Sequence, residues 1–284
     1  MTAVAPASMI STAPNPGGSA AQFSLNSASL TIPLHELARG ARESGFHGLE
    51  LWASDIGGGT SASAIHDLML AHDLKVSAFQ LLRDYEGSPQ PSKNRQLAKA
   101  ENLMDDMVAI GADTLLVCAN AAEDSSGDRA QIVSDLRFLA DMAAHRGLRI
   151  AFEPLAWSRW LNTYEEVTAC ILAADHPSLG LAVDAFHWFW GATPIEHAAA
   201  MPVHKCFEIQ LCDAKPNGLA AIEMARHHRL FPGEGDWPVA ELARAFRELG
   251  FEGFFNIEVF NDDYRNLPPE EFIGRAVASI NSLF

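Results

Sequence analysis

The chain repeats one phrase along its length: an amphipathic stretch of helical period, a Gly or Asp break, and a short apolar segment. One such stretch places Leu34, Leu37, Ala38 and Ala41 at positions i, i+3, i+4 and i+7 of a helix. The apolar segments are nearly unbroken, which is typical of parallel strands covered on both faces. Residues 23–26 supply a first strand, and seven more end at Trp52, Gln80, Cys118, Glu153, Asp184, Gln210 and Glu258. Eight strands alternating with helices predict an α/β fold, a single (β/α)8 barrel of the TIM type.

The domain boundaries follow from composition. Residues 1–21 are rich in Ala, Ser, Pro and Gly and lack the basic and apolar regions of a secretory signal, so we expect a disordered leader there. Residues 22–284 are expected to form the barrel as one catalytic domain. A doubly wound open sheet is the alternative, but it needs a Gly-rich phosphate turn after its first strand. The glycine run 57–59 follows the second strand without GxGxxG spacing, so it indicates a flexible loop.

Charge and cysteine spacing limit the partners. The chain of 284 residues carries 20 Lys and Arg against 36 Asp and Glu, a formal net charge of −16. That charge repels phosphate backbones and anionic membrane surfaces, so we expect neither a nucleic acid nor a membrane partner. The four cysteines have no CxxC spacing, which argues against a zinc ribbon or disulfide framework and favours a reducing cytoplasm. A small molecule is the expected partner, and assembly into a homo-oligomer is compatible with the sequence.

Four polar residues close apolar strands on the second half of the predicted barrel. They are Glu153, Asp184, Gln210 and Glu258, from strands five to eight. Because barrel chemistry lies at the carboxyl ends of the strands, we expect these side chains to converge. Three carboxylates in a poorly solvated site repel one another unless a cation joins them. Oxygen ligands favour Mg²⁺ or Mn²⁺, and Co²⁺ and Zn²⁺ are also compatible. The alternative is that each residue pairs with Arg or Lys or faces solvent, but basic residues are scarce near these strand ends.

Two further residues lie just after strand ends. His187 follows Asp184 by three positions, and an imidazole with a pKa of about 6.5 suits a general base. Its aromatic neighbours also allow a simply packed histidine. Arg83 follows the third strand, where its guanidinium would clamp a substrate carboxylate. An ion pair with Asp84 or Glu86 is the alternative for Arg83.

The long connection 212–237 after the seventh strand has the Pro-Gly and aromatic content of an ordered lid. Arg226 and Arg229 are placed to reach a substrate anion from it. The pair His227 and His228 in the same connection is not expected to bind a second metal, since adjacent side chains point apart on most backbones. Trp157, after the fifth strand, either walls a pocket for a ring-shaped substrate or packs the barrel rim.

Several of these segments together resemble a known family. FQLLRDYEG, FEPLAWSRWLNTY, GLAVDAFH, FPGEGDW and NIEVF are similar to motifs of the xylose-isomerase-like barrel superfamily of sugar isomerases, epimerases and dehydratases. Within it, the chain resembles the bacterial 3-dehydroshikimate dehydratases from about residue 23 to its end. RDYEG together with DAFH is the most discriminating combination. Ser158-Arg159-Trp160 departs from the family's Gly-Arg-His, and this change bears on substrate contacts.

The resemblance implies a reaction and a role for each site residue. It implies a metal quartet of Glu153, Asp184, Gln210 and Glu258, a base at His187, and carboxylate binding by Arg83 and Arg229. The implied reaction is metal-dependent dehydration of 3-dehydroshikimate to protocatechuate through an enediolate, a lyase step of quinate and shikimate degradation. The same metal chemistry serves a ketose epimerase or isomerase, or an inosose dehydratase, acting on a neutral polyol. A neutral polyol has no carboxylate for Arg83. A non-catalytic barrel leaves the converging carboxylates without a role.

Overall fold

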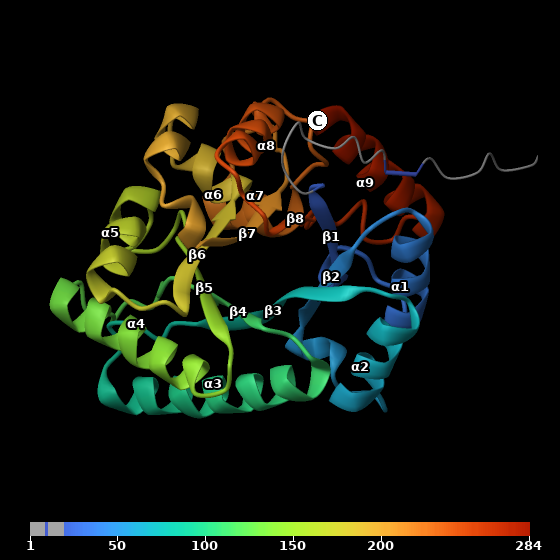
Figure 1. The fold of residues 1–284 in the computed structure, drawn as a ribbon. Helices are drawn as coiled ribbons and strands as arrows, with labels where there is room; N and C mark the ends of the chain where they lie inside the picture. The colour runs from blue at the N-terminus through green and yellow to red at the C-terminus, as the bar shows by residue number, and fades with distance from the viewer. Residues whose placement is uncertain (1–8, 11–19) are drawn as a thin grey trace, which may run out of the picture.

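The computed structural model describes residues 9–10 and 20–284 and forms a closed barrel of parallel strands (Figure 1). The strands pair in chain order, and the first pairs with the last to close the barrel. Their bounds are β1 (Gln22–Asn26), β2 (Gly48–Trp52), β3 (Lys75–Arg83), β4 (Thr114–Cys118), β5 (Arg149–Glu153), β6 (Leu179–Asp184), β7 (Cys206–Leu211) and β8 (Phe254–Ile257). The prediction of a single (β/α)8 barrel is confirmed.

Helices surround the barrel in the order of the chain, as Figure 1 shows. The α-helices are α1 (Leu34–Glu43), α2 (Ala62–Ala71), α3 (Gln90–Ile110), α4 (Arg129–Ala144), α5 (Tyr164–Ala174), α6 (Ala185–Trp190), α7 (Ala221–His227), α8 (Val239–Glu248) and α9 (Pro269–Leu283). The expected apolar stripe of α1 is observed, because Leu37, Ala38 and Ala41 are buried. In the described residues, no helix is both long and apolar enough to cross a membrane.

One strand is longer than the sequence predicts. We expected the third strand to end at Gln80, but β3 continues to Arg83. Its pairing with β4 shifts register between Phe79 and Leu82, and Arg83 then pairs with Cys118. Arg83 therefore lies on the strand end itself rather than in the loop that follows.

The connection after β7 is ordered by one buried carboxylate. Asp213 is fully buried and accepts hydrogen bonds from the backbone N–H groups of Gly233, Gly235 and Trp237 at 3.1, 2.9 and 3.0 Å. A Cβ at Gly235 would collide with the Asp213 carboxylate and with the Ala214 carbonyl, so only glycine fits there. This carboxylate folds the FPGEGDW segment back over the end of β7.

The predicted leader over residues 1–21 falls mostly outside the described residues. Within that range, Ile10 is buried, and its backbone N–H donates to the Ser44 carbonyl at 3.1 Å. The glycine run 57–59 forms a turn in which the backbones of Gly57 and Thr60 bond to each other at 3.0 and 2.8 Å.

Candidate metal centre and substrate cavity

The structure brings the four predicted metal ligands to one end of the barrel. Glu153 ends β5, Asp184 ends β6, Gln210 is the penultimate residue of β7, and Glu258 directly follows β8. All four are buried. Asp184 and Gln210 are direct partners across the β6–β7 pair. The strand order that the sequence predicts is the reason that residues so far apart in the chain converge.

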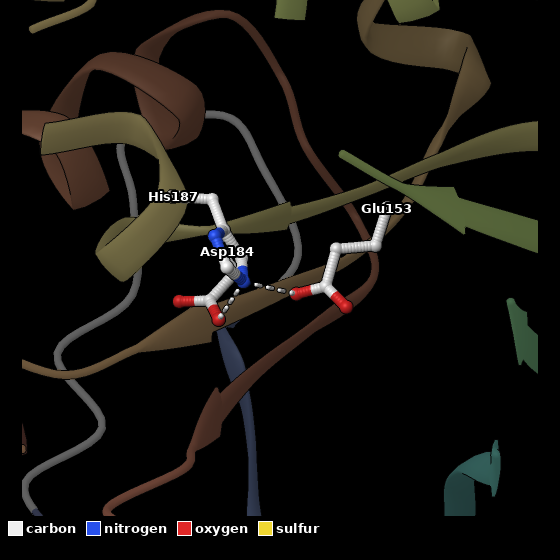
Figure 2. A group of neighbouring side chains, drawn as sticks. All are labelled: Glu153, Asp184 and His187. Atoms are coloured by element: carbon white, nitrogen blue, oxygen red, sulfur yellow. Dashed lines mark ion pairs between the residues drawn. The ribbon is translucent and has the colours of Figure 1, made fainter. Parts of the chain in front are cut away.

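Figure 2 shows how His187 joins two of these carboxylates. Ligand atoms of Glu153, Asp184 and His187 all lie within 4.8 Å of one another. His187 Nε2 is 3.8 Å from Glu153 Oε1 and 3.8 Å from Asp184 Oδ2. The position of the ring follows from the short helix α6, which Asp184 caps by accepting the N–H of Phe186 at 2.7 Å.

A hydrogen bond on the far side of the ring determines which nitrogen of His187 faces the carboxylates. Its Nδ1 accepts the backbone N–H of Ala156 at 3.0 Å. Its other nitrogen, Nε2, is therefore the one that faces Glu153 and Asp184. Burial, partly opposed by Asp184, lowers the pKa of His187 to about 4, and the ring is neutral at pH 7. The role of general base that we expected for His187 stays a prediction.

Gln210 provides the test of whether a metal fits. Its Nε2 donates to Glu50 Oε1 at 2.9 Å and to Glu258 Oε1 at 3.1 Å. Its Oε1 is buried and has no hydrogen-bond partner within residues 9–10 and 20–284. An orphaned carbonyl oxygen beside carboxylates is what a hard divalent cation coordinates. The donor set therefore fits a divalent metal ion.

Glu258 is held by three amide donors. Its Oε1 accepts from Asn26 at 2.9 Å and from Gln80 at 3.0 Å, as well as from Gln210. Burial, partly offset by Arg229, raises the pKa of Glu258 to about 7. We had noted Gln80 only as a strand end and had assigned no role to Asn26. Their signal in the sequence is a polar residue at the end of an apolar strand.

Glu153 has a thiol partner that sequence reasoning missed. Cys118 Sγ, at the end of β4, donates to Glu153 Oε2 at 2.8 Å. Burial raises the pKa of Glu153 well above its usual range, and the charges of Asp184 and Glu258 raise it further. Burial and the Glu153 charge raise the pKa of the Cys118 thiol well above its usual range, which disfavours a nucleophilic thiolate. Its contact instead orients a predicted metal ligand.

Arg229 is buried beside the predicted metal ligands. One terminal nitrogen, Nη1, is 2.9 Å from Asp184 Oδ2 and 2.9 Å from Glu258 Oε2. The guanidinium lies between the rings of Phe186 and Phe260, each 5.1 Å from its centre. In this arrangement its charge balances two of the predicted metal ligands. Arg229 also lines the cavity that opens above these ligands, and its expected contact with a substrate anion stays a prediction. The positive charge of Arg229 offsets the repulsion between these two carboxylates.

A cavity of about 730 Å³ opens above this floor. Its wall is basic, although the chain as a whole is acidic. Arg83, Arg226 and Arg265 line the cavity together with Trp157 and His227. The Arg83 side chain is 52% exposed, and its Nε is 3.6 Å from Asp84, so the ion pair considered above is present but long. Arg265 had not been singled out in the sequence.

The positions of Trp157, His227 and His228 relative to the cavity differ. Trp157 meets His187 edge-on, with ring centroids 5.1 Å apart, so it lies at the site rather than elsewhere on the rim. His227 lines the cavity, whereas the adjacent His228 is exposed and does not line it. The two histidines therefore do not share one site.

Two relatives show what the sequence is similar to. The chain is 34% identical over 253 residues to a 3-dehydroshikimate dehydratase of Pseudomonas putida. That match covers 88% of this chain and 40% of the relative, so the chain spans less than half of the relative's length. It is 23% identical over 209 residues to an inosose isomerase of Bacillus subtilis, covering 72% of this chain and 74% of that protein.

Solved structures share the fold. A fusion protein of a xylose isomerase-like TIM barrel and a 4-hydroxyphenylpyruvate dioxygenase matches with a TM-score of 0.87 and 32% identity, over 91% of this chain and 42% of that one. The IOLI protein, solved with a bound zinc atom, matches with a TM-score of 0.83 and 20% identity, over 92% of this chain and 97% of that one. Residues 38–283 match the family model of that barrel. The chain therefore belongs to the xylose isomerase-like TIM barrel family.

Proposed function

We propose that the protein is a metal-dependent hydro-lyase that converts 3-dehydroshikimate to protocatechuate. The observation that carries the proposal is that one cavity has a floor of carboxylates and a wall of arginines. Its floor holds carboxylates and an orphaned amide oxygen that fit a divalent metal, and its wall carries arginines. A small carboxylated polyol matches both halves. The similarity to a protein named 3-dehydroshikimate dehydratase, at 34% identity over 88% of this chain, supports the choice.

Glu153, Asp184, Gln210 and Glu258 would hold the metal, and Mg²⁺ or Mn²⁺ suits their oxygen atoms best. A bound divalent ion would polarise the ketone of the substrate and acidify the hydrogen on the neighbouring carbon. Co²⁺ and Zn²⁺ remain compatible, and zinc is the ion bound in the IOLI structure.

The other residues would bind and orient the substrate. Arg83 would pair with the ring carboxylate from the rim of the cavity, since its guanidinium is half-exposed and its existing ion pair is long. His187 would be the general base for the hydrogen on the carbon beside the ketone, since its Nε2 faces the ligand carboxylates while the Ala156 N–H holds Nδ1. Trp157 would cover one side of the ring. Arg229, which lines the same cavity, would help Arg83 bind the substrate carboxylate and would balance the charge of the ligand carboxylates.

A second candidate is a ketose epimerase or isomerase, or an inosose dehydratase, acting on a neutral polyol. The similarity to an inosose isomerase, at 23% identity over 72% of this chain, favours it. This candidate uses the same metal ligands and needs no carboxylate partner on the wall. Arg83→Ala separates the two candidates, because it should raise KM strongly only when the substrate carries a carboxylate.

The test is an ultraviolet assay for protocatechuate, with purified protein, 3-dehydroshikimate and Mg²⁺ or Mn²⁺, with and without EDTA. We expect aromatic product that depends on metal and is lost in Glu258→Gln by roughly 100-fold or more, since even residues that only contact metal ligands are commonly worth about 10–100-fold. Glu252→Gln, on the opposite face of the barrel, is the matched control. Absence of product, in protein whose melting temperature still rises with metal, would move the assignment to a neutral polyol.

A further inference from the structure

Glu50 is a carboxylate inside the barrel that is not among the predicted metal ligands. It lies in the middle of β2 and is fully buried. Its Oε2 accepts hydrogen bonds from the side-chain amides of Asn26, at 2.7 Å, and of Asn256. Its Oε1 accepts from Gln210 Nε2 at 2.9 Å. A buried carboxylate needs such donors, and one of the three belongs to a predicted metal ligand.

The direction of these hydrogen bonds is fixed at Asn26, the direct partner of Glu50 across the β1–β2 pair. Asn26 Oδ1 accepts the backbone N–H of Ala28 at 2.9 Å and the indole N–H of Trp52 at 3.1 Å. Both of these groups can only donate, so the oxygen of the Asn26 amide must face them. The NH₂ group of Asn26 therefore faces Glu50, and Glu50 must present an acceptor to it.

The amide of Gln210 is oriented in turn by carboxylates. Its Nε2 lies between Glu50 Oε1, at 2.9 Å, and Glu258 Oε1, at 3.1 Å. If the amide turned over, its oxygen would face two carboxylate oxygens and no donor. The observed orientation leaves Gln210 Oε1 buried and without a hydrogen-bond partner in the part of the chain that the structure describes. That oxygen is the atom available to a metal ion.

Glu50 thus controls which atom of Gln210 a metal ion would meet. We propose that Glu50 is a positioning residue, which accepts Nε2–H of Gln210 and so directs the amide oxygen of Gln210 toward the divalent ion; this inference rests on the metal site of the proposed function. Glu50 itself acts only through Gln210. Glu258 shares the amide, but it is a predicted ligand, whereas Glu50 leaves the metal its full set of oxygens.

The first test is the affinity for Mn²⁺, measured by calorimetric titration of the EDTA-treated full chain. Glu50→Gln keeps the shape and replaces one acceptor with an NH₂ group. Because the donor of Asn26 takes the remaining oxygen, the new NH₂ group faces Gln210, which must meet a second donor or turn its own NH₂ group toward the metal. We expect binding to weaken by roughly 10–100-fold. Glu208→Gln is the matched control, since Glu208 is equally buried on the strand of Gln210 and has no hydrogen-bond partner among the described residues.

A double-mutant cycle separates orientation from charge. If Glu50 acts through Gln210, Glu50→Gln should weaken Mn²⁺ binding by no more than about twofold when it is added to Gln210→Leu. The same large loss in both backgrounds, or wild-type affinity of Glu50→Gln, would overturn the assignment. Wild-type affinity of Gln210→Leu would instead remove Gln210 from the ligand set of the proposed function, and the role of Glu50 with it.

A second readout uses the wild-type chain without metal, so it does not depend on the folding of a Glu50 variant. Side-chain amide hydrogens are observed in ¹⁵N-glutamine-labelled protein, with Gln210→Leu used to assign the signal. We expect both Nε2 hydrogens of Gln210 to exchange slowly with solvent, because each is held by a buried carboxylate. Exchange as fast as that of the exposed Gln90 would show that the amide is not held, and would refute the proposal.

Discussion

Asp213 offers the sharpest test of what orders the connection after β7. Its carboxylate is fully buried and accepts four backbone hydrogen bonds. Oδ1 accepts from Ala214 at 2.8 Å and Trp237 at 3.0 Å, and Oδ2 accepts from Gly233 at 3.1 Å and Gly235 at 2.9 Å. Asp213→Asn changes one of these oxygens into an NH₂ group and leaves the shape nearly unchanged. Two backbone donors would then face a donor.

The magnitude follows from the number of bonds lost. A hydrogen bond to a charged group contributes about 1.5–3 kcal/mol, so losing two costs about 3–6 kcal/mol. That is a large share of the roughly 5–15 kcal/mol that stabilises a typical domain. The loss falls on the segment 231–237, and the backbone bridge between Asp213 and Leu230 lies next to Arg229. We therefore expect lower activity as well as lower stability.

Denaturant unfolding of Asp213→Asn measures the free energy of unfolding, and hydrogen exchange at Gly233 and Gly235 locates the change. Asp236→Asn is the matched control, because Asp236 is an exposed residue of the same segment. We expect faster exchange at both glycines and a loss of several kcal/mol in Asp213→Asn only. A loss below about 1 kcal/mol with unchanged exchange would refute the reasoning that this carboxylate holds the segment.

Three further predictions concern the pH dependence of stability, metal affinity, and the effect of metal on the melting temperature. Burial raises the pKa of Glu86 to about 8, so the folded state keeps a proton that the unfolded state has lost above about pH 4.5. Glu86 should therefore make the unfolding free energy fall as pH rises from 5 to 8, by at most about 1.4 kcal/mol per pH unit for this one group, and Glu86→Gln should reduce the slope of pH-dependent denaturant melts by that amount. Cys118→Ala should weaken metal binding by roughly 10–100-fold in calorimetric titration, because Glu153 loses a donor, whereas Cys118→Ser should retain most of the affinity. Mn²⁺ added to EDTA-treated protein should raise the melting temperature, and Gln210→Leu should abolish that rise; an unchanged rise in the variant would remove Gln210 from the ligand set.

The barrel and the convergence of the four predicted metal ligands were predictable because both depend on strand ends. A closed parallel barrel places the carboxyl end of every strand at one mouth, so the polar residues that end its apolar strands all lie at that mouth. Gln80 and Cys118 carried the same signal, and both contact predicted ligands. The third strand was predicted too short, because a register shift between β3 and β4 is a property of their pairing and leaves no local mark.

The sequence by itself determined the fold class and the residue types at the mouth of the barrel, because helical period and apolar strands are local and periodic. Only the tertiary structure decided the hydrogen-bond and ion-pair partners of each group. The N–H of Ala156, from another loop, holds Nδ1 of His187, and Asp262 contacts Nδ1 of His227. Likewise, the pairing of Arg229 with Asp184 and Glu258 joins segments distant in the chain. Hydrogen bonds and ion pairs of this kind form only when separate loops are placed to within a few tenths of an ångström, and residue identity alone does not specify that placement.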